Sequence, residues 1–198
     1  PYGPRSKQEV RNFTWQMAKA LEKMNVKMLV IACNTATAAA LLSLQKHMPF
    51  PVLGVINAGA RAAIKETKRN EIVVLATEGT IKSGAYEEAV KSLSTKAKVI
   101  PLACPTFVPL VESGEYEGQF SYDLVKNGLK SIENERFDTV ILGCTHYPIL
   151  QKQIEAAVGP DVHVLSSAQE TAKDVEAILS YKGQLRTEKE PPQHVFHA

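Results

Sequence analysis

Two cysteines have similar surroundings in the two halves of this chain. Cys33 lies in IACNTATAAALL (31–42), and Cys144 lies in VILGCTHYPIL (140–150). In each segment an apolar run ends in a small residue and the cysteine, a short polar pair follows, and a helix-like stretch begins. A thiol at a helix N-terminus has its thiolate stabilised by the helix dipole and by free backbone N–H groups, which lowers its pKa. The pattern predicts two reactive thiols, one from each half of a duplicated α/β protein, that face each other across a cleft.

The polar residues near these cysteines predict a site for carboxylates. Asn34, Thr35 and Thr145, together with the backbone N–H groups at the two helix starts, could form a nest for an anion. The hydroxyls of Thr77 and Thr80 follow another apolar run and could hold a second carboxylate, although ordinary turn and capping chemistry explains them as well. A small acidic substrate with one thiol on each side fits this arrangement.

Other interpretations of the same residues stay open at this point. A single free cysteine is most often a small buried hydrophobe, and the repetition argues against this only for the pair. His146 could tune the Cys144 thiol or cap a helix. Zinc binding by Cys33, Cys144 and His146 is disfavoured because no paired short-spacing ligand motif occurs, and no C-x-x-C motif indicates a redox pair. Cys104 is predicted to be a packed cysteine, and Glu112 a solvated charge at a helix end.

The elements that must position these residues are short strands alternating with helices. Apolar, β-branched runs predict strands at 28–32, 52–56, 72–76, 99–103, 139–142 and 162–165. Helices are predicted over 35–47, 84–93, 122–135 and 149–158, and two more begin at capping boxes formed by Ser6 with Glu9 and by Ser167 with Glu170. The alternation predicts an α/β fold of two similar lobes, with mainly parallel sheets in three layers. Ligands bind such sheets beyond the carboxyl ends of the strands, where both cysteine segments lie, so the active site is expected in the cleft between the lobes.

Composition excludes several classes of partner. The chain has 198 residues, a net charge of +2 and 22% charged residues, with no basic stripe for nucleic acid and no polybasic run for a membrane surface. Its apolar runs are too short to cross a bilayer, and the first residues do not have the pattern of a signal peptide, so none is expected. Three cysteines, an odd and small number, favour reduced thiols over a disulfide framework. We therefore expect a cytoplasmic protein with neither nucleic-acid nor membrane partners.

Several motifs together resemble the glutamate racemase family. They are PYGPR, ACNTATA, GVI followed by GARAA, T-x-x-T before SGAY, and GCTHYPIL, and the resemblance extends over essentially the whole chain. The family interconverts L- and D-glutamate without pyridoxal phosphate, metal or nucleotide, and it supplies D-glutamate for bacterial peptidoglycan. The resemblance implies a cofactor-independent isomerase. A racemase of another acidic amino acid such as aspartate is the first alternative, although aspartate racemases typically have glutamate where His146 stands. A noncatalytic thiol-containing binding or redox module is the second.

The resemblance also implies roles for individual residues. Cys33 would take the α-proton from D-glutamate and Cys144 from L-glutamate, each returning a proton to the opposite face of the carbanion, with His146 assisting Cys144. The substrate contacts of the family fall on Tyr2, Gly3, Asn34, Thr35, Thr77, Thr80, Thr145 and His146. Members commonly form dimers, so a homodimer is expected.

The sequence departs from the family at its two ends. Family members begin earlier, with a glycine-rich strand and turn whose aspartate assists the first cysteine and whose serine touches substrate, and they end with a further helix. We expect this chain to be truncated at both ends. Its first lobe, 1–56 with 167–198, would then be incomplete, and its second lobe would be 57–166. We expect the 198-residue chain alone to be inactive or poorly folded.

Overall fold

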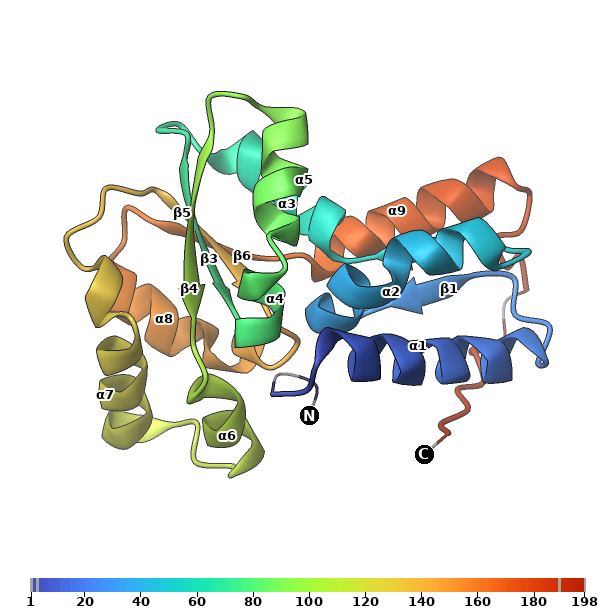
Figure 1. Cartoon of the computed structure of the whole chain (residues 1–198), viewed down its shortest axis with the longest axis horizontal. Helices are drawn as coiled ribbons and strands as arrows, with labels where there is room; N and C mark the ends of the chain where they lie inside the picture. Colours follow the sequence, from blue (N-terminus) through green and yellow to red (C-terminus); the bar gives the residue numbers. More distant parts are fainter. Residues whose placement is uncertain (1, 3, 189, 198) are drawn as a thin grey trace.

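Two parallel β-sheets organise the protein (Figure 1). The computed structural model describes residues 2, 4–188 and 190–197. All the predicted strands form, with small shifts at their ends: β1 (Leu29–Ile31), β2 (Val52–Gly54), β3 (Glu71–Ala76), β4 (Lys98–Ala103), β5 (Thr139–Gly143) and β6 (His163–Ser166). One sheet pairs β1 with β2, and the other has the order β4-β3-β5-β6. The predicted α/β class with parallel sheets is confirmed.

The four-stranded sheet is covered by helices on both faces. Alternate residues of β3 point to opposite sides, so that Val73 and Leu75 enter one apolar core while Ile72 and Val74 enter the other. The first core is closed by α6 (Phe107–Glu112), α7 (Gly118–Gly128) and α8 (Gln151–Val158). The second is closed by α3 (Ile56–Glu66) and α5 (Ala85–Leu93). The result is a three-layer lobe whose central strands β3 and β5 are buried.

The two-stranded sheet belongs to a separate, smaller lobe. Here α1 (Lys7–Glu22) packs on α2 (Asn34–His47), α2 lies against both strands, and α9 (Ala168–Tyr181) contacts β2 and α3. An ion pair between Arg61 of α3 and Asp174 of α9 adds a polar link between the lobes. The division of the chain at 56/57 and 166/167 stays a prediction. None of the helices among the described residues combines the length and the apolarity needed to cross a membrane.

Local signals predicted some helix ends correctly and others wrongly. The capping box of Ser6 and Glu9 forms as predicted at the start of α1. The capping box predicted at Ser167 does not form. Ser167 already has helical backbone angles (φ −67°, ψ −11°), and its side chain makes no capping hydrogen bond. The side chain of Glu170 pairs with Lys173 instead.

Other helices differ from the prediction in extent or were not predicted. The predicted helix at 122–135 begins earlier, at Gly118, and ends at Gly128 before a 3-10 turn, η1 (Lys130–Ile132). The strand predicted at 52–56 stops at Gly54, and its last residue, Ile56, starts α3. In the part of the chain that the structure describes, three α-helices were not predicted. They are α3 and the short helices α4 (Glu78–Lys82) and α6, and neither of the short ones is long enough to show a helical period.

Candidate active site between the two lobes

A cavity of about 660 Å³ lies where the carboxyl ends of the strands from both lobes meet. Cys33 and Thr35 come from the segment after β1, Thr77 follows β3, and Cys144, Thr145 and His146 follow β5. The remaining lining residues are Tyr2, Pro4, Glu78, Cys104, Pro105, Val108, Pro109 and Glu112. The structure therefore brings the two cysteines to one cavity, as the sequence predicted.

Cys33 stands at the N-terminus of α2. Its backbone is extended (φ −86°, ψ 128°), and its carbonyl accepts the N–H of Thr37 at 2.9 Å, which starts the helix. The Cys33 side chain makes no capping bond and is partly exposed. The thiol is thus free to act on a ligand while its backbone is fixed by the helix.

Cys144 is positioned differently from Cys33. It follows β5 and is only 8% exposed, and the next element is a 3-10 turn, η2 (Tyr147–Leu150), rather than an α-helix. Burial raises the pKa of the Cys144 thiol, and the charge of Cys33 raises it further, whereas hydrogen bonds from His146, Thr145 and Tyr147 only partly oppose these effects. The expectation of a lowered pKa is therefore wrong for Cys144, because desolvation outweighs the local donors.

His146 connects Cys144 to a carboxylate across the cavity. Its Nδ1 lies 3.8 Å from the Cys144 Sγ and 3.4 Å from the Thr145 Oγ1. Its Nε2 lies 3.4 Å from Oε1 of Glu112, at the end of α6. Glu112 is half exposed, as expected for a charge at a helix end, but it also faces the site, which sequence reasoning missed. No sequence signal linked two residues this far apart in the chain.

The hydroxyls of Thr35, Thr77 and Thr80, which we call the threonine cluster, hydrogen-bond to one another. The Oγ1 atoms are separated by 2.9 Å for Thr35 and Thr77, 3.1 Å for Thr35 and Thr80, and 3.2 Å for Thr77 and Thr80. Thr77 also caps α4. Thr35 and Thr77 line the cavity, whereas Thr80 is buried behind them. The cluster joins the first turn of α2 to the larger lobe.

Asn34 and Tyr2, both predicted to contact substrate, lie in different cavities. Asn34 is buried and lines a neighbouring cavity of about 490 Å³ that shares Cys144 and Thr145 with the main one. Its Oδ1 accepts a hydrogen bond from the hydroxyl of Tyr86 at 2.7 Å. Tyr2 lines the main cavity and stacks on Phe13 of α1, with ring centroids 6.4 Å apart.

Gly3, also predicted to contact substrate, lies outside the described residues. Tyr86 was not predicted as a site residue. The signal that could have found it is a tyrosine in an otherwise apolar helix face, since a buried phenol requires a hydrogen-bond partner.

Cys104 behaves as the packed cysteine that the sequence indicated. It is 2% exposed, and burial raises the pKa of its thiol to about 12. Within residues 2, 4–188 and 190–197, no three histidine, cysteine, aspartate or glutamate side chains are grouped as a metal site requires.

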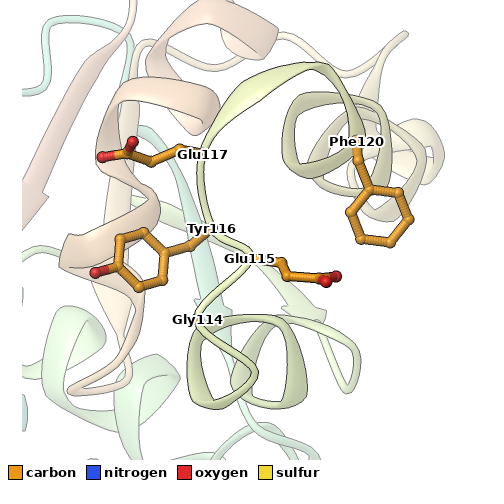
Figure 2. Close-up of a pocket in the computed structure, with 5 residues that line it drawn as sticks. All are labelled: Gly114, Glu115, Tyr116, Glu117 and Phe120. Atoms are coloured by element: carbon orange, nitrogen blue, oxygen red, sulfur yellow. The ribbon is translucent and has the colours of Figure 1, made fainter.

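A further depression of about 620 Å³ lies on the connection between α6 and α7 (Figure 2). Its lining consists of Gly114, Glu115, Tyr116, Glu117 and Phe120. Figure 2 shows the rings of Tyr116 and Phe120 on opposite sides, with the carboxylate of Glu115 between them and that of Glu117 on the Tyr116 side. No residue of either cysteine segment lines it, so the chemistry predicted from the sequence belongs to the cavity between the lobes.

Comparisons with known proteins agree on one family. The family model described as Asp/Glu/Hydantoin racemase matches residues 1–175. The glutamate racemase of Lysinibacillus sphaericus is 76% identical over 198 residues, which are the whole of this chain and 75% of that protein. The glutamate racemase of Bacillus cereus (strain ATCC 10987 / NRS 248) is 50% identical over 196 residues, 99% of this chain and 73% of that protein.

Two crystal structures resemble the fold closely. Glutamate racemase isoform RacE1 from Bacillus anthracis has a TM-score of 0.91 and 47% identity, covering 94% of this chain and 70% of that one. Glutamate racemase from Francisella tularensis subsp. tularensis SCHU S4, in complex with D-glutamate, has a TM-score of 0.90 and 32% identity, covering 96% and 71%.

Proposed function

The chain belongs to the Asp/Glu/Hydantoin racemase family, and we propose that it interconverts L- and D-glutamate with Cys33 and Cys144 as the two bases. Relatives that carry the name glutamate racemase, up to 76% identical over the whole chain, support glutamate as the substrate. The observation that carries the two-base assignment is that both thiols line one cavity, one from each lobe. Glutamate racemisation makes the protein an isomerase that supplies D-glutamate for peptidoglycan.

The two thiols differ in a way that suits opposite roles in each turnover. The pKa of Cys144 is raised by burial and by the charge of Cys33, so the site disfavours two thiolates at once. One thiol can therefore hold a proton while the other is the base. With the α-carbon between them, the base removes the α-proton from one face and the other thiol delivers a proton to the opposite face. Racemisation then needs no rotation of the substrate.

Stabilising the carbanion is the demanding step, because an amino-acid α-proton is far less acidic than a thiol. Preorganised hydrogen-bond donors in a site with little water supply such stabilisation. The hydroxyls of Thr35 and Thr77 line the cavity beside the N-termini of α2 and α4, which supports our proposal that they bind a substrate carboxylate. The position of His146 between Cys144 and Glu112 supports our proposal that it assists proton transfer at Cys144.

The remaining parts of the proposal concern the setting of the reaction. We propose that it proceeds without a cofactor, in the cytoplasm, with no nucleic-acid or membrane partner, and in a homodimer. Size-exclusion chromatography with light scattering tests the dimer, and a single-subunit mass would contradict it. The expectation that residues 1–198 alone are inactive or poorly folded is contradicted if the 198-residue chain racemises glutamate at a rate near that of a complete family member.

Hydrogen exchange at the α-carbon tests the function directly. The full-length protein is incubated with L-glutamate in heavy water, and both deuterium uptake and the appearance of D-glutamate are measured. The proposal requires both. Exchange of aspartate without exchange of glutamate would make the protein an aspartate racemase, and exchange of neither would leave the noncatalytic module as the remaining interpretation.

A further inference from the structure

One buried side chain contacts the residue that follows Cys33 and the residue that precedes Cys144. Tyr86 of α5 is 1% exposed. Its ring lies against Gly143, the residue before Cys144, where an added Cβ would come within 3.2 Å of the Tyr86 Cε2. Its hydroxyl donates to Oδ1 of Asn34, the residue after Cys33, at 2.7 Å. The tyrosine therefore spans the distance between the two cysteine segments.

The surroundings of Tyr86 are shaped to hold the phenol in one place. At Gly59 of α3 an added Cβ would lie 3.2 Å from the Tyr86 hydroxyl, and at Gly143 it would also come within 2.9 Å of the Leu75 carbonyl. Only residues without a side chain leave this much room on the two sides of the ring. Tyr86 thus has little freedom to move, and its hydroxyl position is set by the core of the larger lobe.

The hydroxyl also fixes the orientation of the Asn34 amide. Burial, and the charge of Cys144, raise the pKa of Tyr86, so its hydroxyl stays protonated and remains a donor. Because Oδ1 of Asn34 accepts this bond, the Nδ2 group is left as the part of the amide that can donate to a ligand. Asn34 lines the neighbouring cavity, which shares Cys144 and Thr145 with the main one.

We propose that Tyr86 is a positioning residue for racemisation, which orients the Asn34 amide toward the substrate and sets the first turn of α2, with Cys33, at its working distance from Cys144. The proposal rests on the proposed function, and Tyr86 itself does not touch the reacting atoms. It acts through Asn34 on one side and through the backbone at Gly143 on the other. Removing the hydroxyl alone should disturb the Asn34 side and leave the ring contact with Gly143 intact.

A double-mutant cycle in the full-length protein tests this role. The proteins are the wild type, Tyr86→Phe, Asn34→Ala and the double variant, each assayed for kcat and KM with L- and with D-glutamate. Losing one buried hydrogen bond should raise KM about 3- to 10-fold in Tyr86→Phe. On the Asn34→Ala background the same change should alter KM by less than about twofold, because the group that Tyr86 orients is already gone.

Tyr147→Phe is the matched control. Tyr147 is equally buried, and its hydroxyl donates at 2.9 Å to the Cys104 carbonyl rather than to Asn34. Its effect on KM should be the same with and without Asn34. Since enantiomers have equal free energies, kcat/KM must also be equal in the two directions for every variant, which checks the data internally.

Three results would overturn the proposal while leaving the function standing. In the first, the effects of Tyr86→Phe and Asn34→Ala on KM are additive. In the second, Tyr86→Phe leaves KM unchanged and lowers kcat equally in the wild type and in Asn34→Ala. In the third, the Tyr86→Phe protein does not fold. The last would show that the hydroxyl serves the core. If the wild type itself does not racemise glutamate, the proposed function fails, and the inference fails with it.

Discussion

Replacing Thr35 by valine removes the central hydroxyl of the threonine cluster and keeps the shape of the side chain. Thr35 is buried, and its Oγ1 hydrogen-bonds to Thr77 at 2.9 Å and to Thr80 at 3.1 Å. These bonds join the turn that carries Cys33 to the larger lobe. The substitution should therefore lower both the stability of the protein and its activity.

The size of the stability loss follows from the bonds that are lost and the one that remains. Each hydrogen bond contributes about 0.5–1.5 kcal/mol net, so two give about 1–3 kcal/mol. Thr77 and Thr80 still pair with each other at 3.2 Å, so neither hydroxyl is left without a partner. We therefore expect the lower part of this range, about 1–2 kcal/mol, and a fall in Tm of about 2–8 °C.

Chemical denaturation with Thr14→Val as a control measures this effect. Thr14 is equally buried, but its hydroxyl donates at 2.7 Å to the Val10 carbonyl within α1, a bond of a kind that adds little to a helix. Thr35→Val should be less stable than Thr14→Val by about 1 kcal/mol or more. Equal stabilities of the two variants, together with unchanged racemisation by Thr35→Val, would refute the role assigned to the cluster.

Three further predictions concern single residues. Cys33→Ser removes a charge that raises the pKa of Cys144, so Cys144 should be alkylated at lower pH than in the wild type, as measured by mass spectrometry. An alkylation profile that is unchanged or shifted to higher pH would contradict an effect of Cys33 on the Cys144 pKa. Gly143→Ala would place a Cβ 2.9 Å from the Leu75 carbonyl, so denaturation should show a loss of about 1–3 kcal/mol, and wild-type stability would contradict the close packing. Burial raises the pKa of Asp138, but hydrogen bonds from a neighbouring turn outweigh it, so the folded-state pKa is lowered. The stability this carboxylate provides should be complete above its unfolded-state pKa and disappear as the pH falls through its folded-state pKa, so the stability difference from Asp138→Asn should shrink in acid; a difference independent of pH would contradict this.

The sequence predicted most of the elements because each is encoded locally. The buried strands β3 and β5 are short apolar runs, and the capping box of Ser6 and Glu9 needs only four residues. Prediction was weaker where a tertiary contact decides the outcome. Ser167 has a capping sequence, but its backbone is already helical in the packed structure.

The site shows the same division between local and distant effects. The meeting of Cys33 and Cys144 was predictable, because each cysteine follows the carboxyl end of a parallel strand, where α/β sheets bind ligands, although the two strands belong to different sheets. The raised pKa of Cys144 was not, because burial depends on residues from several elements. Glu112 and Tyr86 were missed for a related reason, since each reaches the site through a partner far away in the sequence.

Exchange and inversion by single cysteine variants test the central claim most directly. The full-length wild type, Cys33→Ser and Cys144→Ser are incubated with L-glutamate and, separately, with D-glutamate in heavy water, and the rate of inversion with deuterium uptake is measured. Two opposing thiol bases predict rapid inversion by the wild type and a loss of about 100-fold or more in each variant, because each lacks a proton donor or acceptor on one face. Inversion by either variant within about tenfold of the wild-type rate would contradict the two-base account, since this loss is too small for a missing base.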